Sequence, residues 1–359
     1  MSETIHFSEK FRTALSKYFA YKSVTDSAFN HNIDAEFVGS DTVHVYEIAT
    51  TPVNNYDKTV DPSMGSRFGK VTEVGDYKYT FQMTQDVSLD RSVDRGNNDA
   101  QFNIKKAGEI MKAYTDKQIR PMKDRYRLKK WAEEAGIHKG MAAAPTTSTI
   151  VADILALHTD MINDDVAPDE GTLYVPRSFV PTLMLAKEWV GLDSLGSKTL
   201  PKGCPAMFDS LEVKPVSDRV FPENVYFAIF VKEAIIAPEK INTFRGIKDS
   251  ENMDGDRLQY RCKYDAFVMP SLASGAAVAC AASAVTATPT ISLSGGKATI
   301  SAASGAVVYY TLDGSDPRYK SADAKVYSAA VDVAKGEVIR CAARVVGKYM
   351  SGIAEKVGE

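Results

Sequence analysis

Apolar residues at helical spacing predict the first two helices of the chain. The first lies near the start of the chain. Its apolar face consists of Phe7, Phe11, Leu15 and Tyr18. This pattern leaves open whether the helix packs on its own domain or lies on a neighbouring subunit. The second, at about residues 98–134, is the longest predicted element, and Pro121 should kink or restart it because proline removes a backbone donor.

Alternating apolar and polar positions predict two strands in the first third, at residues 42–48 and 77–83, which we expect to pair. Between them, at about residues 48–76, lies a segment rich in Gly, Pro, Asn and Asp without apolar periodicity. A loop of this length in a compact domain is usually functional or held by a partner. The pattern therefore indicates a contact with another chain.

The middle of the chain mixes helices and strands. One helix has a periodic apolar face and Thr147 or Ser148 as its expected cap. That face consists of Ile150, Ile154, Leu157 and Met161. The remaining predicted elements are a helix near residues 179–189 and strands at residues 172–176, 208–216, 225–231 and 257–269. This order is α+β and lacks the regular alternation of a doubly wound sheet.

The composition changes at residue 273. Residues 273–288 are small and uncharged, which is typical of a linker. Residues 289–359 contain short alternating strands and predict a small all-β sandwich. In its stretch VVYYTLDGSDP, Asp-Gly predicts a turn, and a calcium or sugar role for Asp313 and Asp316 is the open alternative.

Composition and charge narrow the classes of function. The net charge of −3 argues against a broad basic face that grips nucleic acid. No apolar run approaches the ~18 residues of a membrane span, and the first residues lack a secretion signal, so we expect folding in a cytoplasm.

No catalytic motif is present, and we predict no catalytic, cofactor-binding or metal-binding residue. The five histidines are scattered, and the four cysteines are interpreted as reduced core thiols. The acidic residues 163–171 lack the EF-hand pattern and favour a loop over a calcium site. The basic run at residues 123–131 favours a solvated or subunit-facing stripe over a nucleic-acid contact. An assembly protein fits better than an enzyme.

The order of these elements resembles the major capsid protein of tailed bacteriophages, the Hong Kong 97-type fold, over residues 1–272. RSVDRGNNDAQF leads into the long helix, IRPMKDRYRL is similar to the family's spine helix, and residues 211–241 are similar to its axial hairpin. YRCKYDAFVMPS resembles the closing strand of the peripheral domain.

The resemblance implies a division into domains. It implies an N-terminal arm at residues 1–35 and an axial domain at residues 146–245. The peripheral domain would comprise residues 36–145 and 246–272, with an extended E-loop at about 48–76 and the spine helix at about 98–134.

The resemblance also implies partners. Copies of the chain would form hexamers and pentamers in an icosahedral shell that encloses the phage genome. The double-stranded DNA would be contacted only indirectly. Because the chain starts directly at the arm, a separate scaffolding protein or a cleaved leader is expected, together with a portal. Assembly would take place in the host bacterial cytoplasm, and the product would be the virion capsid. Lys58 and Lys70 lie in the loop and Lys78 directly follows it, but no acceptor Asn can be matched to the family's crosslink.

The last 70 residues resemble a second family. YYTLDGSDP, Tyr327 and VIRCAARVVGKYMSG are similar to the immunoglobulin-like C-terminal domain of chitobiase and β-hexosaminidase. On a shell protein, this resemblance implies an outward-facing decoration domain that binds host or mucosal glycans. Two alternatives stay open: an encapsulin-like compartment shell, and a carbohydrate-binding surface protein.

Overall fold

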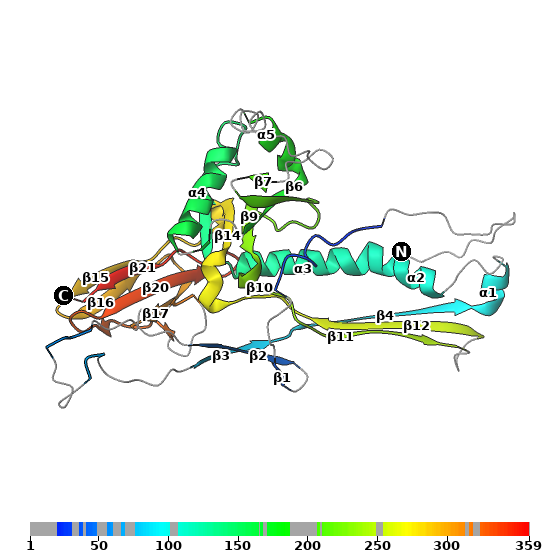
Figure 1. Cartoon of the computed structure of the whole chain (residues 1–359), viewed down its shortest axis with the longest axis horizontal. Helices are drawn as coiled ribbons and strands as arrows, with labels where there is room; N and C mark the ends of the chain where they lie inside the picture. The colour runs from blue at the N-terminus through cyan, green and yellow to red at the C-terminus, as the bar shows by residue number, and fades with distance from the viewer. Residues whose placement is uncertain are drawn as a thin grey trace. The chain divides into compact units, whose positions relative to one another are not determined.

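The computed structural model divides the chain into two units, one of residues 32–85 and one of the remainder. Figure 1 shows the chain. The structure describes residues 20–30, 36–38, 41–48, 56–59, 66–68, 76–100, 107–164, 166–167, 171–186, 207–208, 210–248, 254–312, 316–318 and 324–358. The helix predicted around Phe7 to Tyr18 lies outside these residues.

The smaller unit contains a three-stranded antiparallel sheet in the order β1-β2-β3. Its strands are β1 (Glu36–Val38), β2 (Thr42–Ile48) and β3 (Asp76–Gln82). Val43 and Val45 are buried on one face and stand opposite Phe81 and Tyr79 in the register. The predicted pairing of these two strands is confirmed.

The predicted spine is a composite helix. Its segments are α2 (Ala107–Tyr114), the π-helical η1 (Thr115–Ile119) and α3 (Arg120–Glu133), and a separate short helix, α1 (Arg95–Ala100), precedes them in the chain. Helical structure is continuous from α2 to α3, so Pro121 does not force the predicted restart. The Arg120 N–H bonds to the Thr115 carbonyl, five residues back, and this wide turn places the proline at the start of α3, where its missing donor is tolerated.

A second three-stranded sheet lies in the same unit as this helix, in the order β11-β12-β4. Its strands are β4 (Gln85–Asp94), β11 (Glu239–Ile247) and β12 (Gly255–Tyr264). Tyr260, Cys262 and Tyr264 of β12 form an apolar cluster with Ile119. Asp-Arg pairs cross from β4 to β12, with Arg261 Nε 3.0 Å from Asp86 Oδ1. The predicted strand at 257–269 is interrupted: β13 (Phe267–Val268) pairs separately with β10 (Ile235–Ile236).

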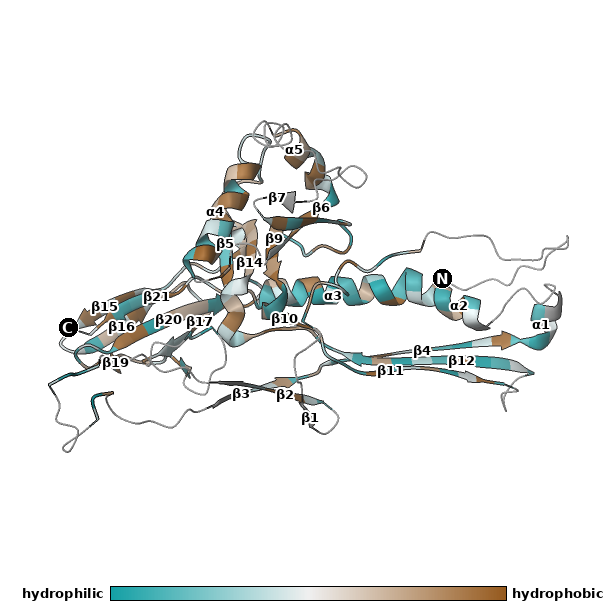
Figure 2. Ribbon diagram, in the orientation of Figure 1, coloured by the Kyte–Doolittle hydropathy of each residue, from teal (hydrophilic) through white to brown (hydrophobic). Residues whose placement is uncertain are grey.

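A six-stranded mixed sheet lies in the body, by which we mean the part of the larger unit that precedes residue 285, and its order is β5-β14-β9-β6-β8-β7. Its strands are β5 (Ile137–Met141), β6 (Gly171–Pro176), β7 (Met207–Phe208), β8 (Leu211–Val216), β9 (Val225–Val231) and β14 (Ala276–Ala281). Figure 2 shows β9 and β14 as largely apolar, whereas α3 is mostly hydrophilic.

Strand β14 contradicts the predicted linker at residues 273–288. It pairs with β5 in parallel and with β9 in antiparallel, and residues 276–280 are fully buried. Both α3 and α4 contact this strand. Small side chains fit because both faces of the strand are covered, and such a strand shows no polar alternation. Residues 276–281 of the predicted linker therefore belong to the six-stranded sheet, and residues 276–280 to its hydrophobic core.

Helix α4 (Ile150–Asn163) confirms the predicted helix, and its four predicted apolar residues are buried. The cap prediction was wrong, because Thr149 is the N-cap and its Oγ1 accepts the Thr146 N–H at 3.0 Å. The next predicted helix is shorter where it is described, as η2 (Arg177–Phe179) and α5 (Val180–Met184). None of the helices formed by described residues has the length and apolar character needed to span a bilayer.

The C-terminal region is all-β, as predicted. One sheet has the order β15-β16-β19 and the other the order β18-β17-β20-β21. The strands are β15 (Thr290–Ser294), β16 (Lys297–Ser301), β17 (Ala306–Thr311), β18 (Lys325–Val326), β19 (Val331–Asp332), β20 (Val338–Val345) and β21 (Ala354–Val357). Residues of both sheets, including Ile300 and Cys341, share a separate apolar core.

Two truncations test the position of β14. A chain ending at residue 284 keeps the six-stranded sheet and should unfold cooperatively, with a Tm lowered by about 5 °C for the lost contacts of the C-terminal domain. A chain ending at residue 272 lacks β14 and should show no cooperative melting transition by circular dichroism. Equal stability of the two truncations would contradict the assignment of β14 to the core.

Candidate functional site

The Asp124 carboxylate on α3 holds the chain segment at residues 20–30. Four donors converge on it: Tyr21 Oη at 2.9 Å, Ser23 Oγ at 2.7 Å, the Val24 amide at 2.9 Å and Thr25 Oγ1 at 2.6 Å. Asp124 is fully buried. Burial and the neighbouring Asp124 charge raise the pKa of Tyr21, so its hydroxyl stays a donor. A buried carboxylate is tolerated because its oxygens are satisfied.

Arg127 extends this junction to β11. Its Nη1 donates to Thr25 Oγ1 at 3.0 Å and to Asp26 Oδ1 at 2.6 Å, and its Nη2 donates to Glu239 Oε1 at 2.8 Å. Lys123 Nζ also donates to Glu239 Oε1 at 3.0 Å. Both cations are buried. The prediction of a solvated or subunit-facing stripe is therefore wrong for these two basic residues, which bind acidic residues of their own chain. Those acidic partners lie about a hundred residues away in the sequence.

Apolar contacts complete the attachment of this segment. Phe29 is buried beside Trp131 and lies under the Arg127 guanidinium, 5.0 Å from the ring centroid. Trp131 Nε1 donates to the Ile236 carbonyl, and the Asn30 amide bonds to the Ile235 carbonyl at 3.1 Å. Residues 20–30 thus pack on their own chain. The predicted contact with a neighbouring subunit concerns the residues before them, which lie outside the described part.

The C-terminal domain is attached to the body through Tyr349. The Tyr349 ring stacks on His138 of β5 at 5.1 Å, and its hydroxyl donates to the Glu223 carbonyl at 3.3 Å. Thr286 Oγ1 donates to the Tyr349 carbonyl at 2.8 Å and accepts the Val345 amide. Only η5 (Ala282–Ala284) and this bonded segment separate β14 from β15. The C-terminal domain is therefore joined to the body by specific contacts and not by a flexible linker alone.

His138 is held neutral at this junction. Its Nε2 lies 2.7 Å from the Ala132 carbonyl, which can only accept, so Nε2 carries the proton. Its Nδ1 is buried without a hydrogen-bond partner. Burial lowers the pKa of His138 to about 4, the Ala132 carbonyl opposes this, and the charges of Arg318 and Arg344 add to it. A protonated ring would place a charge in a site that does not solvate it.

The predicted E-loop is described only at residues 56–59 and 66–68. The Asp57 amide donates to the Arg67 carbonyl at 3.0 Å, so the two sides of the loop meet there. Tyr56 and Phe68 form an edge-to-face pair at 5.0 Å, and Phe68 is 78% exposed. Among the described residues, this pair leaves a large apolar side chain uncovered.

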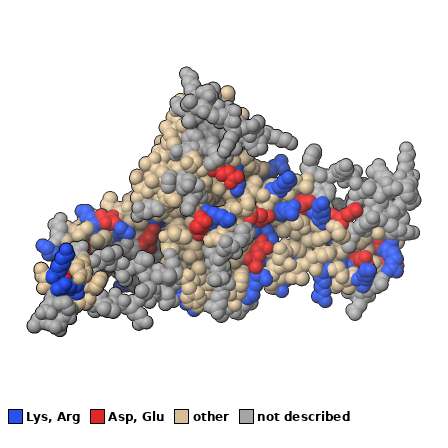
Figure 3. All heavy atoms as spheres, viewed as in Figure 1, with Lys and Arg blue, Asp and Glu red and all other residues tan. Residues whose placement is uncertain are grey.

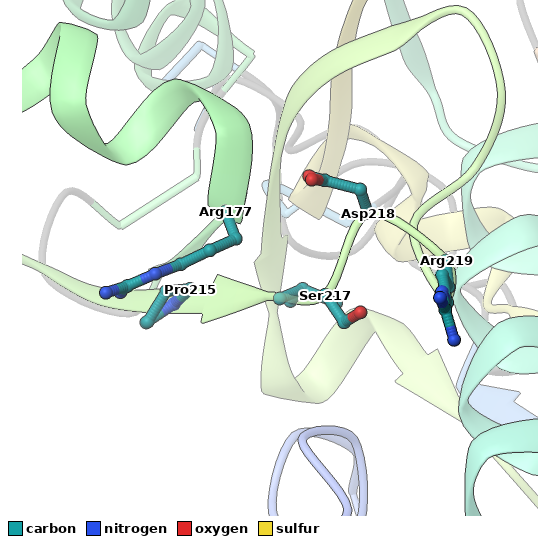
Figure 4. Close-up of a pocket in the computed structure, with 6 residues that line it drawn as sticks. Arg177, Pro215, Ser217, Asp218 and Arg219 are labelled. Carbon is teal, nitrogen blue, oxygen red and sulfur yellow. The ribbon is translucent and has the colours of Figure 1, made fainter.

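A shallow hollow of about 440 Å³ lies between the ends of β6 and β8. It is lined by Arg177, Pro215, Val216, Ser217, Asp218 and Arg219. In Figure 4, Arg177 and Arg219 flank the hollow on opposite sides, with Ser217 between them. Sequence reasoning missed this pair because the two arginines are 42 positions apart and only the neighbouring ends of β6 and β8 bring them together.

The described acidic, histidine and cysteine side chains do not gather into a metal-binding cluster. Among them, no group of three or more His, Cys, Asp or Glu side chains could hold a metal ion. Cys262, Cys280 and Cys341 are buried and free, as predicted, and burial raises the pKa of Cys280 to about 12. Both carboxylate oxygens of Asp316 bind Arg318, at 3.0 Å from its Nε, whereas Asp313 lies outside the described residues. On the face in Figure 3, described acidic and basic side chains are interspersed.

Comparison with known proteins supports both predicted resemblances. The family model for the chitobiase/beta-hexosaminidase C-terminal domain matches residues 284–355. No curated protein matches the chain. The chain is similar to the capsid of cyanophage P-SCSP1u, at 7% identity and a TM-score of 0.61, and the match covers 77% of this chain and 93% of that one.

Two further phage structures are similar. The mature capsid of bacteriophage PhiM1 matches at 12% identity and a TM-score of 0.56, covering 76% of this chain and 91% of that one. A structure from Microbacterium phage Oxtober96 matches at 13% identity and a TM-score of 0.55, covering 76% of this chain and 96% of that one. The predicted capsid fold with an added C-terminal immunoglobulin-like domain is confirmed.

Asp124→Asn tests the junction on α3. The amide keeps the size of the side chain but presents an NH₂ group to donors, so we expect a loss of about 3 kcal/mol in the free energy of unfolding in urea. Protease should also cleave residues 20–30 faster. The matched control is Asp90→Asn on exposed β4, where a small effect is expected. Equal losses for the two variants would contradict a special role for Asp124.

The Tyr349 contact should depend on pH. Because the docked His138 ring has a lowered pKa, docking is complete above pH 6.5 and weakens as the pH falls towards about 4. Between pH 8 and pH 5, the docking equilibrium should weaken about 30-fold. Hydrogen exchange at residues 284–288 measures this effect, and His138→Gln should remove the pH dependence. A pH-dependent exchange that persists in His138→Gln would exclude this histidine as the cause.

Proposed function

We propose that the chain is a major capsid protein of a tailed bacteriophage, a structural protein without catalytic activity. The observation that carries this proposal is the fold: the likeness spans more than 90% of the compared phage capsid chains. Copies of the chain would assemble into hexamers and pentamers of an icosahedral shell that encloses the genome, in the host bacterial cytoplasm.

Each part of the chain has a proposed place in the shell. Residues 1–35 form the arm and about 48–76 the E-loop that reaches a neighbouring copy. The sheet of β4, β11 and β12 with the spine helix belongs to the peripheral domain. We assign the six-stranded sheet to the axial domain, including β5 and β14 at residues 137–141 and 276–281.

The remaining partners follow from the same proposal. A scaffolding protein and a portal would act during assembly, and double-stranded DNA would be contacted only indirectly, in agreement with the interspersed charges and the net charge of −3. Residues 285–359 would face outward and present a surface to host or mucosal glycans. Their separate apolar core supports a module that the shell itself does not require.

Electron microscopy of the expressed chain, with its scaffold where one is needed, tests the proposal. We expect closed shells or capsomers, and the chain truncated at residue 284 should assemble at a similar protein concentration. A chain that stays monomeric under all conditions would overturn the capsid role. Particles from the native source that hold protein cargo and no DNA would indicate a compartment shell instead.

A further inference from the structure

The two sheets of the C-terminal domain differ in the faces that they turn away from their shared core. In the three-stranded sheet, Ile291, Ala298 and Ile300 point into that core, so the residues that alternate with them on β15 and β16 point outward. Five of these outward residues carry hydroxyl groups, and all five are exposed: Thr290, Ser292, Ser294, Thr299 and Ser301. This face is polar, and none of its described residues exposes a large apolar side chain.

The outer face of the four-stranded sheet is different, because it exposes apolar side chains. Val308 and Tyr310 of β17 belong to the core, so Val307 and Tyr309 point outward. Val326 stands opposite Tyr309 in the register and shares its face. Val307 is 41% exposed and Val326 is 59% exposed. Together with Tyr309 they form an apolar group on one side of the domain, for which the other sheet has no counterpart among its described residues.

Arg344 adds a cation to this apolar group. It is exposed and stands opposite Val307, which places it diagonally from Tyr309, and such positions are about 7 Å apart. Ala342 stands opposite Tyr309, and its methyl group is too short to separate the two longer side chains. The tyrosine ring and the guanidinium group can therefore contact the same small ligand.

The charge of Arg344 is not compensated on this face. The preceding outward residue of β20 is Arg340, whose Nε donates to Glu355 Oε2 at 2.8 Å, so these two charges compensate each other. Within the described part of the chain, Arg344 has neither a hydrogen bond nor an ion pair. The outer face therefore presents a net positive charge beside its apolar group.

The backbone under this group is fixed before a ligand arrives. Strand β17 is paired on both sides, with β18 and with β20. Beneath it, Tyr310 and Tyr327 form an edge-to-face pair, and Tyr327 Oη accepts the Ile300 amide of the other sheet at 3.1 Å. Tyr327 directly follows Val326, so this bond also holds the short β18 in place. A preformed surface lowers the entropy that is lost on binding.

We propose that this face binds an acidic saccharide, with Tyr309, Val307 and Val326 against the sugar ring and Arg344 paired with its carboxylate. An aromatic ring and short apolar side chains match the C–H face of a sugar ring. A guanidinium group binds a carboxylate through two parallel hydrogen bonds. This inference rests on the proposed presentation of residues 285–359 to glycans, and it names the face and the class of sugar.

The charge of the face argues against a second copy as its occupant. Two identical faces packed together would place Arg340 and Arg344 of both copies in one interface, with only Glu355 of each copy to compensate them. Like charges brought together in an interface cost several kcal/mol in general, which suppresses such a pairing. A ligand that brings a carboxylate and no cation removes this conflict.

Binding of the full chain to immobilised alginate, a polymer of carboxylated sugars, tests this site by biolayer interferometry. The comparison ligands are dextran, which is uncharged, and polyglutamate, which has carboxylates and no sugar. We expect alginate to bind about tenfold more tightly than either polymer. Tyr309→Ala should weaken alginate binding about tenfold, because the ring contact is lost. Arg344→Glu should weaken it about tenfold at low salt, because the carboxylate then meets a like charge.

The matched controls are Thr299→Ala, on the outer face of the other sheet, and Lys335→Glu, an equal change of charge on an exposed turn. Both should bind alginate like the wild type. Circular dichroism should give all four variants the Tm of the wild type, since each substituted side chain points away from the core.

Alginate binding that is unchanged in Tyr309→Ala and Arg344→Glu overturns this site. If Thr299→Ala weakens binding instead, the glycan function stands and this inference fails. Equally tight binding to polyglutamate, or no binding to any of the three polymers, also overturns the inference, while the capsid role stands if shells assemble. A chain that binds alginate through Tyr309 and never assembles supports this site and overturns the capsid role alone.

Discussion

Burial of the Asp124 carboxylate and the Arg127 guanidinium on one face of α3 is the constraint on which the body depends. Neither group is stable in an apolar interior without partners. The segment at residues 20–30 supplies hydroxyl and amide donors to Asp124, and Glu239 supplies an acceptor to Arg127. Three distant parts of the sequence are therefore held in one arrangement, and removing any of them leaves a buried charge unsatisfied.

This constraint orders the surrounding structure. Once residues 20–30 are bound, Phe29 closes over Trp131 and the apolar core that includes β9 and β14 is sealed on that side. Trp131 in turn fixes the chain at Ile236, next to the short β10–β13 pair. The polar junction and the apolar core thus stabilise each other, since the junction positions the aromatic ring and the ring excludes water from the junction.

Periodicity predicted the elements that have one apolar face. Helix α4 and the β2–β3 pair belong to this group, because one side of each meets the core and the other meets solvent or a polar layer. Strand β14 was missed because it is covered on both faces, and small buried residues carry no alternation. The network of Lys123 and Arg127 and the closeness of Arg177 to Arg219 were missed, because these residues are remote in sequence from the groups that the tertiary structure brings beside them.

The continuity of β14 with the C-terminal domain has a mechanical consequence. A force that pulls the C-terminal domain away from the body runs along the polypeptide into a strand that is hydrogen-bonded on both sides, to β5 and to β9. The load is then carried in shear by two ladders of bonds at once, and not by one terminal residue or a flexible peptide. Forced separation of the C-terminal domain would therefore be resisted by the six-stranded sheet itself.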